Sequence, residues 1–153
     1  MRAVRVFGLV VAAVQLASMI AFGASMYTIL LVASSTASGD ATAISVSIDE
    51  TTGVGFLRLD TATRNEGLLG VNMKIGVYAL DAEGERFADN STSVHLEVGQ
   101  EEPVSLTLRL PAGLIRRMLD GDGDCFEVTV ELRTLNDMVG ASNTMTYRGG
   151  GSA

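Results

Sequence analysis

The sequence of 153 residues contains a single cysteine, a single histidine and no basic run. A lone cysteine, Cys125, excludes an internal disulfide framework and a four-ligand zinc site. Aspartates precede it, and nearby negative charge disfavours a thiolate, so Cys125 is expected to be a small residue at the start of a strand. A disulfide between two chains stays open. The formal net charge of −7 and the lack of a basic run argue against nucleic-acid binding.

Charge is also absent from one long segment, the 28 residues from Val6 to Ala33. A bilayer core about 30 Å thick requires about 20 helical residues. A secretory signal peptide has a shorter apolar region, about 7–15 residues, followed by a small-x-small cleavage site. Ala21-Phe22-Gly23 resembles such a site, but the apolar character resumes at Met26. The segment therefore predicts a retained transmembrane helix over 6–33, with the lipid bilayer as its partner.

The flanking charges predict how this helix crosses the cell membrane. Arg2 and Arg5 precede it, and the first charge after it is Asp40. The positive-inside rule then places residues 1–5 in the cytoplasm and projects the rest outward as a single-pass protein. We expect a linker over 34–42, a folded domain over 43–149 and a flexible tail over 150–153. Asn90-Ser91-Thr92 is a glycosylation sequon and is compatible with an outward location.

One face of the predicted helix carries small side chains at every fourth position. Small residues at this spacing allow two helix backbones to approach closely in lipid, and a glutamine amide in hydrocarbon requires a hydrogen-bond partner. These features predict self-association through Ala13, Gln15, Ala17, Ala21 and Ser25. Alanine and serine are also common in membrane helices, so the same pattern fits a helix without a partner.

A filament subunit of the pilin type is an alternative. In such a subunit an apolar N-terminal helix packs in the core of a fibre and a β domain faces outward. The layout of this chain fits that arrangement. The run Arg5-Val6-Phe7-Gly8, however, does not place a basic residue directly before the glycine, as a processing site of this kind requires.

Beyond the apolar segment, apolar and polar residues alternate with period two, which is typical of strands with one buried face. Turn residues such as Asn65-Glu66-Gly67 and Asn136-Asp137 separate the alternating runs. About seven short strands of this kind predict an all-β fold, an antiparallel β-sandwich. The expected strands lie around residues 44–48, 57–59, 71–77, 94–98, 104–110, 126–132 and 138–147.

One segment, PAGLIRRMLDG, breaks the period and predicts a short helix between the fifth and sixth strands. Pro111 suits a helix start and Gly121 a C-cap. Arg116 and Arg117 are expected to face away from the core. The side chains expected to face the core are Leu114, Ile115, Met118 and Leu119.

This order of elements resembles the late-embryogenesis-abundant type 2 domain, also called the water-stress and hypersensitive-response domain. The resemblance covers residues 54–149, about two thirds of the chain, and lies in the segments LRLDTATRNEG, GVNMKIGVYALDAEGERFA, STSVHLEVGQ, EEPVSLTLRLP, LIRRMLDG and FEVTVELRTL. It implies an immunoglobulin-like sandwich without a catalytic site, often tethered outside a membrane by one N-terminal helix. It also implies a link with stress or desiccation tolerance.

The turn LDGDGDC spaces three carboxylates two residues apart: Asp120, Asp122 and Asp124. They match positions 1, 3 and 5 of an EF-hand loop, with Glu131 at position 12. A strand over 126–132 would place Glu131 roughly 20 Å from Asp124, and Cys125 stands where that loop has its glycine, so an EF-hand is excluded. A smaller metal site made by the three aspartates stays open. The alternative is a solvated turn in which glycines supply the backbone angles.

Catalytic signals are sparse. The only histidine, His95, lies on the polar face of a predicted strand, and no phosphate loop, nucleophile elbow or metal-ligand spacing occurs in the sequence. We therefore predict a non-enzyme without a cofactor. The expected function is that of a membrane-anchored structural or interaction module at the cell surface, with an unidentified protein partner.

Overall fold

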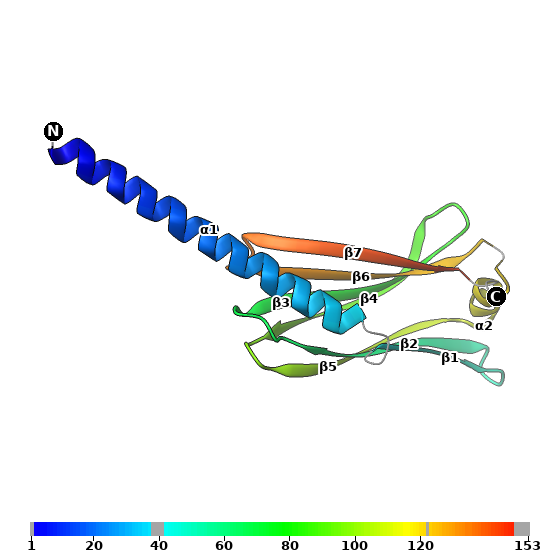
Figure 1. Ribbon diagram of the computed structural model, residues 1–153. Coiled ribbons are helices and arrows are strands. Elements are labelled where there is room, and N and C mark those ends of the chain that lie inside the picture. Colours follow the sequence, from blue (N-terminus) through cyan, green and yellow to red (C-terminus); the bar gives the residue numbers. More distant parts are fainter. Residues whose placement is uncertain (1, 38–41, 122, 149–153) are drawn as a thin grey trace.

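A computed structural model describes residues 2–37, 42–121 and 123–148 (Figure 1). Within these residues the chain forms one long N-terminal helix and seven antiparallel strands, with one short helix between the fifth and sixth strands. This confirms the predicted all-β sandwich with one short helix, preceded by an apolar N-terminal helix. The elements are α1 Arg2–Ala37, β1 Thr42–Asp49, β2 Val54–Arg64, β3 Val71–Leu80, β4 Arg86–Leu96, β5 Glu101–Pro111, α2 Ala112–Asp120, β6 Cys125–Thr134 and β7 Val139–Arg148.

The strands form two sheets, with the orders β1-β2-β5 and β4-β3-β6-β7. The pairings Arg64 with Glu101, Val71 with Leu96, and Thr134 with Val139 show that three connections lie at the same end of the sandwich. We call this the helix-proximal end; it consists of residues 65–70, 97–100 and 135–138. Figure 1 shows α1 leaving the sandwich past this end, whereas α2 lies at the opposite end.

The core lies between the two sheets and follows from the period-two pattern. Alternate side chains of each strand point inward, because successive side chains of a strand face opposite sides of the sheet. Burying one such aliphatic side chain contributes about 1.5–3 kcal/mol. The core includes Leu57, Leu59, Val71, Met73, Ile75, Val77, Leu96, Val104, Leu106, Leu108, Leu110, Val128, Val130 and Leu132.

Helix α1 is continuous from Arg2 to Ala37 and belongs to two environments. Its side chains from residue 10 to residue 20 are exposed. Its last third contacts β2, β6 and β7, and Ile29 and Val32 are part of the core cluster. The predicted linker over 34–42 is wrong in its first part, because α1 continues to Ala37 and Ser35 donates a hydrogen bond to the Arg64 carbonyl. Residues 38–41 of that linker lie outside the described residues. The hydroxyls of Ser34, Ser35 and Thr36 bond to carbonyls of the preceding helical turn, and those of Ser35 and Thr36 also bond to β2, so the helix continues to Ala37.

Helix α2 begins after Pro111 and is capped by Gly121, as expected. Gly121 adopts the left-handed conformation, with φ 81°, and its N–H bonds to the Arg117 carbonyl. The prediction that Leu119 faces the core is wrong, because the buried row of this short helix is Ala112, Ile115 and Met118, spaced three residues apart. Val98 was expected to continue the inward row of the fourth strand, but β4 ends at Leu96 and Val98 lies exposed in the following turn.

Candidate functional site at the helix-proximal end

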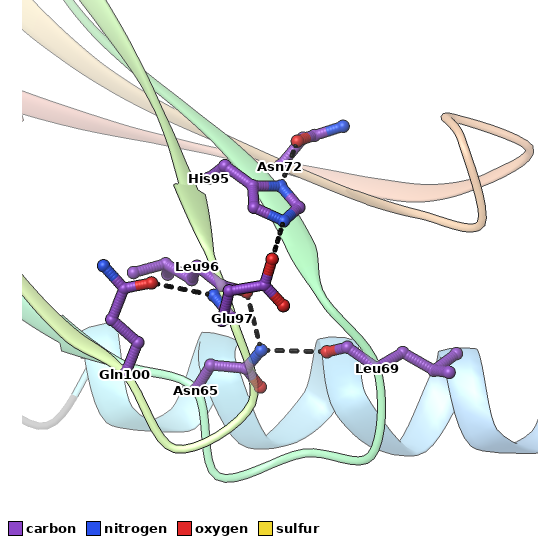
Figure 2. Close-up of polar contacts among 7 residues, drawn as sticks. All are labelled: Asn65, Leu69, Asn72, His95, Leu96, Glu97 and Gln100. Carbon is purple, nitrogen blue, oxygen red and sulfur yellow. Dashed lines mark hydrogen bonds and ion pairs between the residues drawn. The ribbon is translucent and has the colours of Figure 1, made fainter.

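Asn65 connects two of the three loops at the helix-proximal end (Figure 2). Its side chain is fully buried, and its Nδ2 donates to the Leu69 carbonyl at 2.8 Å and to the Leu96 carbonyl at 3.0 Å. Its Oδ1 accepts the Gly67 N–H at 3.0 Å. Its backbone N–H and carbonyl bond to Gln100 and Gly99. Buried amides are stable only when their groups are paired in this way, so Asn65 holds the loops in one arrangement.

The same loop contacts α1 through Gly67 and Leu68. The Leu68 N–H donates to Thr28 Oγ1 at 2.9 Å, and the Thr28 hydroxyl in turn donates to the Ala24 carbonyl within α1. Gly67 lies so close to Thr28 that an added Cβ would stand 2.7 Å from the Thr28 Cβ. A glycine is required here by the close approach of loop and helix. Helix and sandwich are therefore joined by packing and by a specific hydrogen bond.

His95 forms a second polar group on the outer surface of the β4-β3-β6-β7 sheet. Its ring nitrogens lie 2.6 Å from Asn72 Oδ1 and 3.3 Å from Glu97 Oε1 (Figure 2). Asn72 Nδ2 donates to Asp137 Oδ1 at 3.2 Å, which ties the β6–β7 turn to β3. The sequence placed His95 on a polar strand face, and the structure agrees, since its side chain is about half exposed.

These two polar groups differ in what they can do. The Asn65 group is buried and fixes the positions of the loops. The His95 group is exposed, and the groups that contact its imidazole are an amide and a carboxylate, neither of which is a hydroxyl or thiol nucleophile. In the described part of the chain, no group of three His, Cys, Asp or Glu side chains could hold a metal ion. The hydrogen bonds of Asn65 and Asn72 therefore fix the positions of the three loops at the helix-proximal end.

The predicted helix-packing face is divided between two environments. Ala13, Gln15 and Ala17 are exposed, and Ala21 is half-buried. Ser25 is fully buried, and its hydroxyl donates to the Ala21 carbonyl at 2.8 Å. Ser25 is therefore covered by its own chain and cannot contact a second helix. The prediction of self-association stays a prediction for the exposed part of the face.

The acidic turn does not gather its carboxylates in the described residues. Asp120 is exposed, and Asp122 lies outside the described residues. Asp124 is buried, with its Oδ2 3.0 Å from Arg117 Nε, in an ion pair whose N–H is not directed at the oxygen. Glu131 lies within β6 and pairs with Arg133, so it points to no shared site. Because Asp122 lies outside the described residues, the three-aspartate metal site stays a prediction.

Two further sequence candidates are placed by their strands. Asn90 is half-buried in β4, and its Nδ2 donates to the Thr107 carbonyl of β5 at 2.9 Å, so a glycan on this nitrogen would break a contact between the sheets. Cys125 is buried as the first residue of β6. A disulfide between chains would require this end of the strand to open.

Sequence reasoning did not single out Asn65, Thr28 or Asn72. Asn65 was identified only as a turn residue, because its hydrogen-bond partners are up to 31 residues away. A signal for the packed part of α1 was present, since Ser25, Thr28, Ile29 and Val32 follow helical spacing. That stripe distinguishes the packed third of the helix from the apolar remainder.

No protein-family model matches the sequence, and no curated protein matches it. The fold is similar to part of a β-glucuronidase 2 from Bacteroides uniformis, covalently bound to cyclophellitol-6-carboxylate aziridine, with a TM-score of 0.52. It is similar to part of another Bacteroides uniformis β-glucuronidase structure with a TM-score of 0.51. In both cases the identity is 11%, and the match covers 72% of this chain and 13% of that chain. The chain therefore corresponds to about an eighth of those enzymes, and the likeness establishes a β-sandwich fold alone.

Proposed function

We propose that this chain is a single-pass membrane protein that holds a non-enzymatic β-sandwich outside the cytoplasm as a structural or interaction module. The coarser part of this statement is observed: a β-sandwich follows one apolar helix. That helix contains a 27-residue stretch, Val10–Thr36, that is long and apolar enough to cross a membrane. The proposal adds the membrane, the orientation and the role.

The observation that carries the proposal is the division of α1. A helix that belonged to the domain core would be buried along its length, whereas here the side chains from residue 10 to residue 20 are all exposed. Large contiguous apolar surfaces are rarely left in water and mark interaction or membrane sites. The last third of α1 is packed into the sandwich, so insertion of the free part would hold the domain directly against the bilayer.

We also propose that the chain has no catalytic activity, because neither the His95 group nor the apolar hollow near α2 combines the features of a catalytic pocket. A catalytic pocket combines a concave apolar surface with a few convergent polar groups. One apolar hollow near α2 is lined by Val46, Leu57, Ile115, Met118, Phe126 and Tyr147, among others, and Arg148 is the one charged side chain on it. The His95 group lies at the other end of the sandwich. The resemblance to the late-embryogenesis-abundant type 2 domain supports a stress-protective role.

Fractionation of cells that produce the full chain tests the membrane anchor. We expect the intact chain to stay with the membrane after alkaline carbonate washing, and protease added from outside to digest the β-sandwich. The mass of the recovered chain should include residues 6–33. A soluble chain that begins after Ala24 would show that the apolar segment is a cleaved signal, and would contradict the proposal.

Orientation has its own control. Replacing Arg2 and Arg5 by glutamate removes the positive charge on the N-terminal side, and we expect part of the population to become protected from external protease. Digestion equal to that of the unchanged chain would show that Arg2 and Arg5 do not set the orientation. A β-sandwich that is protected in the unchanged chain would refute the orientation while leaving the anchor intact.

A pilus-like filament subunit is the second candidate, and one observation favours it. The exposed part of α1 projects from a domain that is fixed to the same helix, so several copies could bundle their apolar helices in a fibre core. Electron microscopy of material sheared from cells distinguishes the two candidates. Fibres that contain this chain would support the filament, and its recovery in membranes alone would support the anchor.

A further inference from the structure

The helix-proximal end exposes three large apolar side chains, one on each loop. Leu68 is 63% exposed, Val98 55% and Met138 83%. Outside α1, these are the most exposed large apolar residues of the described chain; the others are Leu119 at 51% and two phenylalanines at 40% or less. Single exposed apolar residues are ordinary on protein surfaces. Three exposed apolar side chains on separate loops at one end indicate that one partner covers them together.

The position of these three residues relative to α1 is informative. The three loops lie at the end past which α1 leaves the sandwich (Figure 1). The other exposed large apolar residues of the β domain lie on strands or on α2: Phe56 near the start of β2, Phe87 near the start of β4, and Leu119 in α2. These three lie toward the end that carries α2, and each is less exposed than Leu68, Val98 and Met138. The loop that carries Leu68 contacts α1 directly, and the exposed part of α1 projects past the end that presents the three loops.

The depth of this end along the helix follows from the hydrogen bond between Leu68 N–H and Thr28 Oγ1. A helix rises about 1.5 Å per residue, so the segment from Arg5 to Thr28 is about 35 Å long. The hydrocarbon core of a bilayer is about 30 Å thick. With Arg5 at one surface, Thr28 and the Leu68 loop lie just beyond the other surface, at the level of the lipid headgroups.

We propose that Leu68, Val98 and Met138 form a lipid-contacting tip that inserts into the headgroup–acyl boundary of the bilayer that α1 crosses. This inference rests on the proposed membrane anchor and adds a second contact between the domain and the lipid. The domain is thereby held in one orientation on the membrane, with α2 and the opposite end directed away from it.

The loops are built to hold these side chains in place. Asn65 binds the first loop to the second through Gln100 and Gly99, and Asn72 binds the third through Asp137. The β6–β7 turn that presents Met138 contains three successive residues with positive φ: Leu135 at 51°, Asn136 at 52° and Asp137 at 68°. Such strain at non-glycine residues persists only where the surroundings hold it and is concentrated at functional positions.

The charges beside the tip indicate the class of lipid. Glu66, Glu97 and Asp137 lie on the same three loops, and Arg64 is within 3.5 Å of Glu66. The loops 65–70, 97–100 and 135–138 themselves contain no lysine or arginine, so the residues that would insert carry no positive charge to attract anionic headgroups. Insertion of the tip depends on apolar burial, and neutral zwitterionic lipid is sufficient for it.

Tryptophan fluorescence tests the proposal cleanly, because the chain contains no tryptophan. The full chain is reconstituted in phosphatidylcholine vesicles with a single substitution at each tip position: Leu68→Trp, Val98→Trp or Met138→Trp. Phe22→Trp, on the exposed part of α1, reports the anchor itself. Leu119→Trp, in α2 at the opposite end, is the matched exposed control.

We expect each tip tryptophan to show blue-shifted emission and to lose more than half of its intensity when the vesicles contain lipid brominated near the headgroup end of the acyl chain. Leu119→Trp should remain unquenched with water-like emission. If Phe22→Trp is quenched and the three tip positions are not, the anchor stands and the tip proposal is wrong. If Phe22→Trp is also unquenched, the anchor itself fails.

A second set of variants tests whether the three residues act together. In the Met138→Trp chain, the added changes Leu68→Glu and Val98→Glu place charge at the other two loops. We expect bromolipid quenching of Trp at 138 to fall severalfold while circular dichroism and the quenching of Phe22→Trp in a parallel chain stay unchanged. Equal quenching with and without the two glutamates would overturn the proposal, as would insertion that requires anionic lipid.

Discussion

Replacing Asn65 by alanine should strongly destabilise the β-sandwich. The substitution removes two donated bonds, to the Leu69 and Leu96 carbonyls, and one accepted bond, from the Gly67 N–H. An unsatisfied buried polar group costs about 1–3 kcal/mol. Partial relaxation of the Leu69 carbonyl toward solvent reduces the sum, so we expect a loss of about 3–5 kcal/mol in the free energy of unfolding.

The assay is urea unfolding of the full chain in detergent micelles, followed by circular dichroism in the β region. Domains of this size unfold with free energies of about 5–15 kcal/mol, so a loss of this size moves the midpoint to much lower urea. Asn72→Ala is the matched control. It removes an exposed asparagine from the same end, with one hydrogen bond to Asp137 and one to His95, and we expect about 0–1 kcal/mol.

Two outcomes of the unfolding experiment would contradict this prediction. If Asn65→Ala unfolds within about 1 kcal/mol of the unchanged chain, the loops are not held by this amide, since a single lost bond of ordinary strength accounts for that much. If both asparagine variants lose the same large amount, the effect belongs to the helix-proximal end in general and not to the buried amide.

Two further predictions use the same unfolding assay. Gly67→Ala places a Cβ 2.7 Å from the Cβ of Thr28, which is fully buried and whose hydroxyl is bonded to Leu68 N–H and to the Ala24 carbonyl. We therefore expect a loss of about 1–3 kcal/mol and faster proteolysis near α1, and an unchanged midpoint would show that the loop can move away from the helix. A hydrogen bond from the Thr52 side chain, followed by one from the Thr51 N–H, lowers the pKa of Asp49 below its ordinary 3.8. Because the folded pKa is the lower one, Asp49 contributes stability that is complete well above pH 3.8 and is lost as the pH falls through the folded value. The difference in stability from Asp49→Ala should therefore be constant near neutral pH and shrink in acid, and a difference that grows in acid would contradict the assignment.

Most elements of the sandwich could be predicted because strand formation leaves a local pattern. Alternation from Val104 to Leu110 and from Phe126 to Leu132 fits strands in which every second side chain is buried, and both strands occur as expected. Pro111 and Gly121 bounded α2 correctly, since their backbone preferences act within a few residues. Leu119 was assigned to the wrong side because a nine-residue helix has room for only one narrow buried row.

The helix-proximal end was harder to predict because its contacts are long-range. Thr28 bonds to Leu68, 40 residues later, and Asn65 bonds to Leu96, 31 residues later. Neither hydrogen bond produces a periodic pattern of residues in the sequence from which it could be predicted. The three exposed residues of the tip are separated by 30 and 40 positions in the sequence, and only the pairing of the strands brings their loops to one end.

The amino-acid sequence by itself determined that a long uncharged helix precedes a set of two-faced strands, because charge, hydropathy and period are properties of neighbouring residues. The tertiary structure alone decided where that helix divides. Its side chains from residue 10 to residue 20 are exposed, and one face of its last third is buried because residues of β2, β6 and β7 meet around Ile29 and Val32. Burial of a helix residue depends on which side chains from distant parts of the sequence pack against it. Those contacts form only when the two sheets pack against each other.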